Sequence, residues 1–196
     1  MNKSWLASSV EIREMARPEN KDDAPLPMNV GAVWNDPSGK SFYVYGGIAP
    51  YFKGADRVTT KGIWKFTPSD NKWSLESPSN PSVRSNIRPT FDGSYVTVDK
   101  TNTGYWIGGY AEKGKTENSE SKLPPTVMPG LVSLNMATGE WKNETASDLA
   151  PGGILRGAAG LWLPRFGPNG LVSFLGGRTS DGDGGKIGRA SCRERV

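Results

Sequence analysis

A short apolar strand pattern that ends in two glycines occurs three times in this chain and constrains its fold more than any other feature. The copies lie at residues 42–47, 105–109 and 171–177. Aromatic and β-branched residues favour strands, and the glycine pair ends each one. The 196 residues also include 25 Gly, 15 Pro and 7 Trp, a composition typical of tight turns between short aromatic strands. We therefore expect an all-β fold.

Each copy belongs to a longer pattern of two consecutive hairpins. The expected strands of the first unit are residues 30–34, 41–45, 63–67 and 72–75. The unit returns at residues 95–98, 105–107, 131–136 and 140–143, and its first half returns at residues 160–163 and 171–175. Three residue pairs are each 68 positions apart, namely Trp73 and Trp141, Arg88 and Arg156, and Gly108 and Gly176. We interpret both members of each pair as equivalent positions of successive repeats.

A four-stranded unit repeated at this interval is typical of a β-propeller blade. The chain resembles the kelch family through the glycine pairs together with strand residues Trp64, Phe66, Trp73, Leu134 and Trp141. The resemblance covers residues 1–185 and is closest to kelch-type, galactose oxidase-like proteins of filamentous fungi, through residues 130–136 and 165–171. The glycine pairs are 62 and 68 residues apart, against about 50 for an ordinary kelch unit, so each blade carries insertions.

The expected fold is a partial kelch β-propeller with about two complete four-stranded antiparallel blades and flanking part-blades. Trp5 sits where the last strand of a preceding blade would carry its Trp. The expected divisions are residues 1–29 (that strand and a connection), 30–76 (a blade), 77–143 (a blade), 144–186 (the first hairpin of a further blade) and 187–196 (a tail). A propeller needs about four to eight blades to close, so we expect this fragment alone to be aggregation-prone or partly unfolded.

The last ten residues, 187–196, resemble the translation of a DNA sequencing-library adapter, and we treat them as non-native. They contain the chain's one Cys, together with three Arg and one Glu, so the net charge falls from +4 to +2 without them. This balance does not predict a nucleic-acid partner, which would need clustered basic residues. No run of about 18 apolar residues predicts a membrane span within the fragment, although a longer protein could carry one downstream.

The repeat places all long connections at one end of the blades, at residues 48–61, 76–94, 110–129 and 144–157. Long loops are commonly functional, so we expect a protein or carbohydrate ligand on this face. The candidate binding residues are Arg88, Arg156, Tyr110, Arg178 and Tyr51. Arg donors and an aromatic platform suit an acidic peptide or a sugar. The alternative for the repeated Arg, which we favour, is that it bridges neighbouring blades or donates to loop carbonyls.

Other motifs have structural interpretations that we prefer. The Trp residues at repeat positions could stack on carbohydrate, but we expect them to form the core between blades. Residues 181–184 lack the Glu that a calcium loop requires, so we interpret them as a turn. Asn143 and Asn2 each begin an N-glycosylation acceptor motif, which agrees with an extracellular setting.

Galactose oxidase-like proteins would be expected to hold copper through two His and a Tyr linked to a Cys. This chain has no His, and its Cys lies in the tail, so we expect no metal, no cofactor and no catalytic residue in it. The leading hypothesis is a non-catalytic binding or scaffold module of a fungal cell-surface or secreted protein. The alternatives are a fragment of a secreted galactose oxidase-like enzyme with its catalytic residues elsewhere, and a cytoplasmic kelch adaptor.

Overall fold

The computed structural model of the chain describes residues 24–25, 28–48, 62–88, 90–111, 126–127, 130–145 and 156–178. Within these ranges the regular structure is almost entirely β-strand, with one short α-helix and one 3-10 turn. The prediction of an all-β fold is confirmed. Two four-stranded antiparallel sheets and a further hairpin are present and do not close into a ring, as expected of partial propeller blades.

The first sheet has four antiparallel strands in sequence order. They are β1 (Ala32–Asn35), β2 (Phe42–Tyr45), β3 (Ile63–Thr67) and β4 (Lys72–Glu76). Because side chains alternate along a strand, Ala32 and Trp34 share one face of β1 and Val33 points to the other. One predicted boundary was wrong, since Val30 lies before β1 with a φ of 52°, outside the extended range.

The second sheet repeats this arrangement. Its strands are β5 (Ser94–Val98), β6 (Thr103–Ile107), β9 (Gly130–Asn135) and β10 (Glu140–Thr145). The sheet order β10-β9-β6-β5 again places consecutive strands side by side. The 3-10 turn η3 (Asp99–Thr101) joins β5 to β6, and Asn102 ends it with a φ of 52°.

Two connections that the sequence predicted as loops contain short elements. The helix α1 (Pro81–Ser85) lies between β4 and β5, with Pro at its first position, where the missing N–H costs little. The strands β7 (Tyr110–Ala111) and β8 (Thr126–Val127) pair with each other between β6 and β9.

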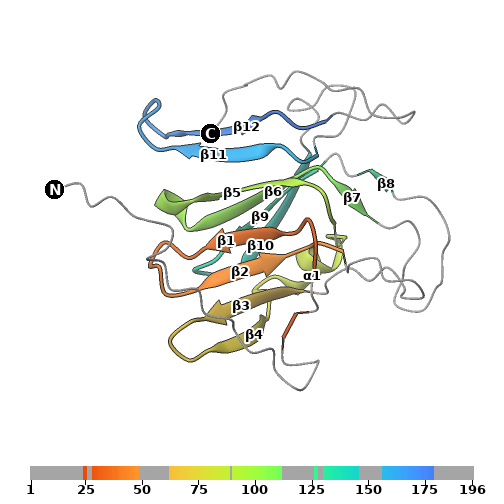
Figure 1. The fold of residues 1–196 in the computed structure, drawn as a ribbon, viewed down its shortest axis with the longest axis vertical. Helices are drawn as coiled ribbons and strands as arrows, with labels where there is room; N and C mark the ends of the chain where they lie inside the picture. The colour runs from red at the N-terminus through yellow and green to blue at the C-terminus, as the bar shows by residue number, and fades with distance from the viewer. Residues whose placement is uncertain are drawn as a thin grey trace, which may run out of the picture.

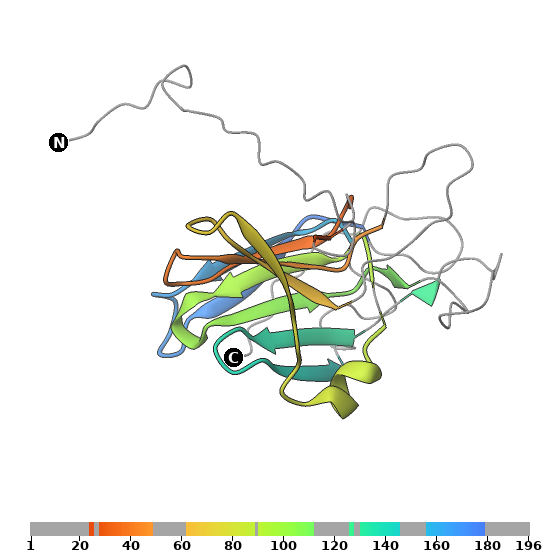
Figure 2. The same cartoon turned by 90° about the horizontal axis from the view of Figure 1, so that it is seen from below.

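The third unit is the hairpin β11 (Ala159–Leu163) and β12 (Leu171–Leu175). Strand β5 lies between β1 and β11, so the first strands of the three units are neighbours (Figure 1). Seen from below, β9 and β10 extend away from β5 and β6 (Figure 2). The units therefore pack face to face along their first strands. We call the face that each unit turns toward the following unit its front face, and the opposite face its rear face.

The core between the first two sheets is aromatic. Trp34 stacks on Tyr45 with ring centroids 5.3 Å apart, and Trp106 meets the same Tyr45 edge-on at 5.6 Å. Trp141 lies 6.4 Å from Trp34 and 5.3 Å from Tyr45. All four rings are fully buried, so the prediction that repeat-positioned Trp residues form the core between units is confirmed for Trp34, Trp106 and Trp141. Trp73 and Trp162 are only half-buried.

Burial determines the chemistry of Tyr45 in this core. Desolvation raises the pKa of its hydroxyl, although the charge of Arg84 and the nearby Thr90 hydroxyl act in the opposite direction. Arg84 itself lies over the Trp141 ring, with its guanidinium carbon 5.1 Å from the ring centroid. Tyr45 is therefore a neutral packing residue at physiological pH.

The turn between β1 and β2 is held by Asp36. Its carboxylate accepts hydrogen bonds from the Ser38 N–H at 3.0 Å, the Ser38 hydroxyl at 2.9 Å and the Ser41 hydroxyl at 2.9 Å. Partial desolvation raises the pKa of Asp36, but these hydrogen bonds outweigh it, with Lys65 contributing, and the net pKa is lowered. The turn is thus stabilised by the ionised carboxylate.

Candidate functional site

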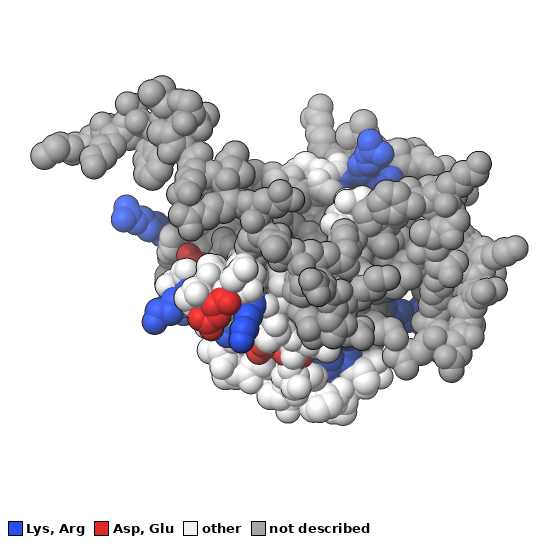
Figure 3. Space-filling model, turned by 60° about the horizontal axis from the view of Figure 1, so that its bottom comes forward, with Lys and Arg blue, Asp and Glu red and all other residues white. Residues whose placement is uncertain are grey.

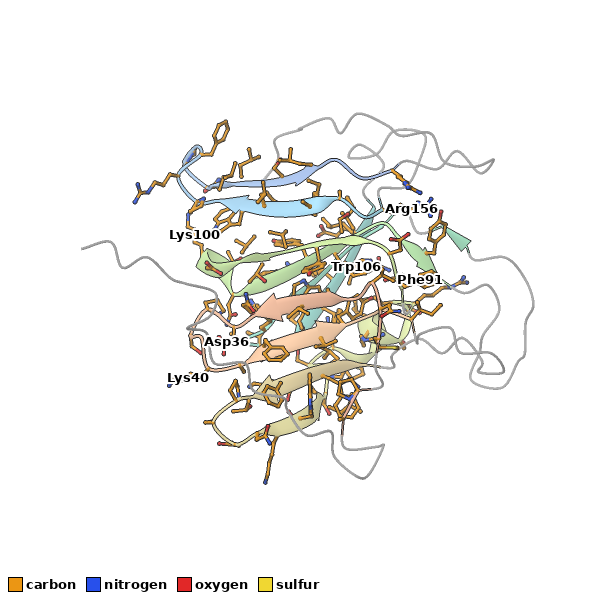
Figure 4. All side chains as sticks on the ribbon, viewed as in Figure 1. Asp36, Lys40, Phe91, Lys100, Trp106 and Arg156 are labelled. Atoms are coloured by element: carbon orange, nitrogen blue, oxygen red, sulfur yellow. The ribbon has the colours of Figure 1, made fainter. Side chains whose placement is uncertain are left out.

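The two ends of the sheets differ in what they carry. Figure 4 shows Asp36, Lys40 and Lys100 at the end with the short turns, and Phe91 and Arg156 at the opposite end. At that second end, three isolated bridges extend the hairpins beyond the glycine pairs, and they join Asn29 to Ile48, Phe91 to Tyr110, and Arg156 to Arg178. This is the end where the sequence predicts the ligand-binding face.

The glycine pairs shape this end of each unit. Gly46 and Gly47 have φ values of 65° and 89°, and Gly108 and Gly109 have 68° and 82°, a range that disfavours other residues. A Cβ on Gly46 would also overlap the Thr90 carbonyl oxygen of the next unit. Glycine is required here for both backbone conformation and close approach.

A backbone ladder links the three units next to these bridges. Val30, Asp92 and Gly157 occupy equivalent positions, one residue after each bridge, with φ values of 52°, 59° and 61°. The Asp92 N–H donates to the Val30 carbonyl at 3.0 Å, and the Gly157 N–H donates to the Asp92 carbonyl at 3.3 Å. Each unit therefore hydrogen-bonds to the one before it at the same backbone position.

Arg156 is at the centre of the side chains gathered at this end. Its Nη1 lies 3.5 Å from Asp92 Oδ2, and its guanidinium carbon lies 5.2 Å from the centroid of the Tyr110 ring. Tyr110 also contacts Phe91, with ring centroids 5.9 Å apart. Asp92, Tyr110 and Phe91 all belong to the second unit, so Arg156 bridges the hairpin to the second sheet, the alternative that the sequence favours.

Arg178 adds a second cation beside Arg156. The two residues form an antiparallel bridge, with N–H to carbonyl distances of 3.1 Å and 2.9 Å. Directly opposed residues on neighbouring strands have adjacent side chains, so their like charges disfavour each other. Arg178 is exposed, and Asp92 is the one acidic side chain among the described residues that pairs with Arg156. The cluster of Phe91, Asp92, Tyr110, Arg156 and Arg178, which we call the Arg156 cluster, thus has one more cation than anions.

The structure brings together three of the five predicted binding residues, Arg156, Tyr110 and Arg178. Arg88 is exposed in the connection that leads to β5 and is not part of the cluster. Tyr51 and the acceptor Asn2 lie outside the described residues. Asn143 is exposed on β10, which is an edge strand of the second sheet.

The predicted equivalence of Arg88 and Arg156 is wrong. Ser94 pairs with Ile107 and Ala159 pairs with Leu175, and the extended registers set Phe91 opposite Tyr110 and Arg156 opposite Arg178. The residue equivalent to Arg156 is therefore Phe91. The cause is the connection between β11 and β12, which spans residues 164–170, whereas the connection between β5 and β6 spans residues 99–102.

Sequence reasoning missed Phe91 and Asp92. Equivalent segments at residues 29–31, 91–93 and 156–158 each begin three positions before the first strand of their unit. This constant distance to the strand start was the available signal. This signal is found by counting back from the start of each first strand. The interval of 68 residues between the second and third glycine pairs does not reveal it, because that interval includes the longer turn between β11 and β12.

A separate cavity of about 280 Å³ lies between the first and second sheets. Its lining includes Tyr43, Lys65, Glu76, Leu134, Met136 and Trp141. The Tyr43 hydroxyl donates to the Met136 carbonyl at 3.3 Å, and Lys65 Nζ lies 5.6 Å from the Tyr43 ring centroid. None of the predicted binding residues lines this cavity.

Charged side chains of both signs lie next to one another on the described part of the face in Figure 3. Across the described residues, no group of three His, Cys, Asp or Glu is placed to hold a metal ion. No helix among those residues is long and apolar enough to cross a membrane.

No family model matches the chain, and no curated protein sequence matches it either.

Proposed function

We propose that this chain is a non-catalytic propeller module of the kelch type that binds an acidic peptide segment through the Arg156 cluster. The observation that carries the proposal is the direct opposition of Arg156 and Arg178 at the loop end of the units, with only Asp92 paired to Arg156 among the described residues. An anionic ligand would relieve the repulsion between the two cations.

The cluster offers two kinds of contact. Arg178 is exposed and can form charge-assisted hydrogen bonds with a ligand carboxylate. Phe91 and Tyr110 are partly exposed rings that can pack against an apolar or aromatic neighbour in the same peptide. Arg156 is already held by Asp92 and the Tyr110 ring, and its buried Nε has no hydrogen-bond partner in the part of the chain described. Arg156 therefore orients the cluster, and Arg178 makes the main ionic contact.

The proposal includes a position at the cell surface or in a secreted protein, as for the fungal kelch-type proteins that the repeat resembles. Exposure of Asn143 on an edge strand supports it, because a bulky glycan at this position would project into solvent and displace no packed residue. Expression through a secretory pathway should add a glycan at Asn143, detected by peptide mass spectrometry. An unmodified Asn143 in the secreted chain would contradict this part of the proposal.

Isothermal titration with a Glu-rich decapeptide that contains one Tyr, compared with its Gln-substituted counterpart, tests the function. Arg178→Gln should weaken binding of the acidic peptide about tenfold, which corresponds to about 1.4 kcal/mol. Arg165→Gln removes the same charge from an exposed position in the turn between β11 and β12 and should leave binding unchanged. Binding should also weaken with added salt.

Three results would contradict the proposal. Equal losses for the Arg178 and Arg165 variants would indicate non-specific attraction to net charge. Equal binding of the acidic and Gln-substituted peptides would exclude recognition of carboxylates. Binding of an oligogalacturonate with no binding of either peptide would favour a carbohydrate ligand instead.

A further inference from the structure

The cavity between the first two sheets lies away from the strands through which these sheets meet. The sheets approach most closely at β1, whose neighbours in the second sheet are β5 and β6. Further from β1, the cavity of about 280 Å³ lies between the front face of β2, β3 and β4 and the rear face of β9 and β10. Both walls are complete four-stranded sheets within the described residues, so this cavity is internal to the fold.

The connection that follows β4 is fixed to the β9–β10 hairpin beside the cavity. The Ser79 N–H donates to the Gly139 carbonyl at 2.9 Å. The Asn80 side chain donates to the Trp141 carbonyl at 2.8 Å and accepts from the Trp141 N–H at 2.9 Å. Gly139 and Trp141 both line the cavity, so these hydrogen bonds hold part of its wall in place. The cavity is therefore pre-formed, as binding sites for small molecules commonly are.

A cation and an anion line the cavity without pairing with each other. Lys65 lies opposite Ser74, and Glu76 lies opposite Ile63, so Lys65 and Glu76 are diagonal neighbours on the front face. Neither charge forms an ion pair with another residue in the described part of the chain. Glu76 Oε1 accepts from the Ser74 hydroxyl at 2.7 Å, and Glu76 Oε2 has no hydrogen-bond partner among the described residues. Both charges are thus able to bind a ligand.

The Tyr43 hydroxyl lies within the influence of both charges. Burial raises the pKa of this hydroxyl, Lys65 lowers it and Glu76 raises it, and the net pKa is raised. The hydroxyl donates to the Met136 carbonyl at 3.3 Å, so Tyr43 is fixed in the cavity wall. The fields of the cation and the anion therefore meet within one small space.

The remaining deep part of the lining is apolar. Ile63 from the first sheet and Leu134 and Met136 from the second are all buried. Trp141 is the most deeply buried lining residue, and its indole Nε1 has no acceptor among the described residues. Buried polar atoms normally have a partner, so an acceptor that enters the cavity beside Trp141 would be stabilised.

We propose that this cavity binds a free α-amino acid with an apolar side chain. The ligand carboxylate pairs with Lys65, and the ligand ammonium group pairs with Glu76. The ligand side chain packs against Ile63, Leu134 and Met136. The site is separate from the Arg156 cluster, because no residue of that cluster lines the cavity.

Charge and size favour this class of ligand over the others. Glu76 would repel an acid that has no amine, and Lys65 would repel an amine that has no acid, whereas a zwitterion pairs with both. A neutral sugar would leave both charges without an ionic partner. Pockets for drug-sized ligands have volumes of about 300–1,000 Å³, so this cavity suits a single small molecule better than a peptide.

Isothermal titration of the full chain with three ligands of similar shape tests the proposal. L-leucine carries both charges, N-acetyl-L-leucine lacks the ammonium group, and 3-methylbutylamine lacks the carboxylate. L-leucine should bind, and each of the other two should bind about tenfold more weakly or worse, because each leaves one lining charge without a partner. This comparison needs no substitution.

Two substitutions assign the lining charges to the two ends of the ligand. Lys65→Met should weaken binding of L-leucine about tenfold and remove the preference for L-leucine over 3-methylbutylamine. Glu76→Gln should weaken binding of L-leucine by a similar factor and remove the preference for L-leucine over N-acetyl-L-leucine. Each combination of variant and ligand forms a double-mutant cycle that isolates one ionic contact.

Matched control variants remove the same charges elsewhere. Lys40→Met and Glu140→Gln act at exposed positions that do not line the cavity, and both should bind L-leucine like the wild type. Arg178→Gln should also leave binding of L-leucine unchanged, because Arg178 belongs to the Arg156 cluster. The outcome at this cavity is therefore independent of the outcome for the acidic peptide.

The side chain of Trp141 reports whether the ligand occupies the cavity. In NMR spectra, the indole N–H signal of Trp141 should shift as L-leucine is added, because Trp141 lines the cavity. The indole signal of Trp162 on β11, which does not line the cavity, should stay in place.

Several results would overturn the proposal. Absence of L-leucine binding at millimolar concentrations would exclude the site. Equal binding of all three ligands would exclude recognition of the charges, and tighter binding of either analogue would indicate a site for one charge only. An unmoved Trp141 signal at saturation would place the ligand elsewhere, and equal losses in the Lys65 and Lys40 variants would exclude a contact at Lys65. If circular dichroism shows that a variant is unfolded, the three-ligand comparison and the Trp141 signal of the wild type decide the question.

Discussion

The contact between the first and second sheets and the contact between the second sheet and the β11–β12 hairpin use equivalent backbone positions with different side chains. The first contact buries Trp34, Tyr45, Trp106 and Trp141 as a cluster of rings. The second contact has a smaller apolar cluster, of Ile107 and Leu131 with Ala158 and Phe174. It also has polar contacts, including the Ala158 N–H to the Ser94 hydroxyl at 2.8 Å and the ion pair between Arg156 and Asp92.

The comparison separates what the repeat provides from what its side chains provide. In both contacts the ladder hydrogen bond is present, at 3.0 Å and 3.3 Å. The buried apolar area differs, because each of the four fully buried rings of the first contact buries about 150–250 Å², whereas the second contact has one ring in its apolar cluster, Phe174, and that ring is only half-buried. We therefore expect the first contact to be the more stable, with the hairpin exchanging its amides sooner.

The largest effect is expected at the equivalent positions Trp34, Val96 and Leu161. Replacement of Trp34 with Ala should cost about 3–5 kcal/mol of unfolding free energy, because it leaves a large cavity in the ring cluster. The same change at Val96, which is buried, should cost about 2 kcal/mol, and at Leu161, which is exposed, less than about 0.5 kcal/mol. Urea unfolding measures all three. Equal losses at the three positions would contradict the difference between the contacts.

The next effect concerns the close approach of the hairpin to the second sheet. A Cβ at Gly160 would overlap the Tyr95 carbonyl, so Gly160→Ala should weaken this contact by about 1–3 kcal/mol. Hydrogen exchange should show lower protection in β11 and β12, with the first sheet unchanged. Gly167→Asn is the control, because Gly167 lies in open space at a φ of 68° that Asn tolerates. Unchanged exchange in the Gly160 variant would indicate that the hairpin is not packed there.

A comparable or smaller loss is expected at Ser94. Its hydroxyl accepts from the Ala158 N–H, so Ser94→Ala should leave that N–H without a partner and cost about 1–2 kcal/mol. The equivalent residue in the first sheet is Ala32, which shows that Ala fits this position. Thermal unfolding compares the variant with Ser85→Ala, which removes an exposed hydroxyl and should be nearly neutral. Similar values for both would show that the Ser94 hydrogen bond contributes nothing.

The smallest effect on stability is expected when a fall in pH protonates Asp36, which lies in the β1–β2 turn, remote from both contacts. Its folded-state pKa is lower than the unfolded value of 3.8, so its contribution to stability is present above 3.8 and is lost as pH falls through the lowered pKa. Asp36→Asn should flatten this part of the stability profile, measured by urea unfolding from neutral pH downward. A profile identical to that of the wild type would show that Asp36 does not contribute.

Several features could be predicted because they depend on residues close in sequence. The glycine pairs mark the ends of β2, β6 and β12, since their positive φ values end the strands locally. The equivalence of Trp73 and Trp141 is confirmed, because Trp73 pairs with Phe66 and Trp141 pairs with Leu134 in the same register. The candidate site was predicted in part, through Arg156, Tyr110 and Arg178.

Other features could not be predicted because they depend on the length of intervening turns or on contacts between units. The spacing of 68 residues pairs Arg88 with Arg156, but the longer turn before β12 shifts the register by three residues. The sequence pattern predicts Val30 in a strand, but its φ is left-handed, and its carbonyl accepts a hydrogen bond from Asp92 of the next unit. Asp92 has no local sequence signal that distinguishes it from an ordinary turn residue.

The sequence by itself determined the strands, the tight turns and the order of the repeated units. These follow from strand propensity and from glycine's freedom to adopt positive φ, which act within a few residues. Only the tertiary structure decided which side chains of different units meet, and so which residues join Arg156 and which leucines of the hairpin remain exposed. The physical reason is that packing between sheets depends on the register across each turn, and neither propensity nor spacing determines that register.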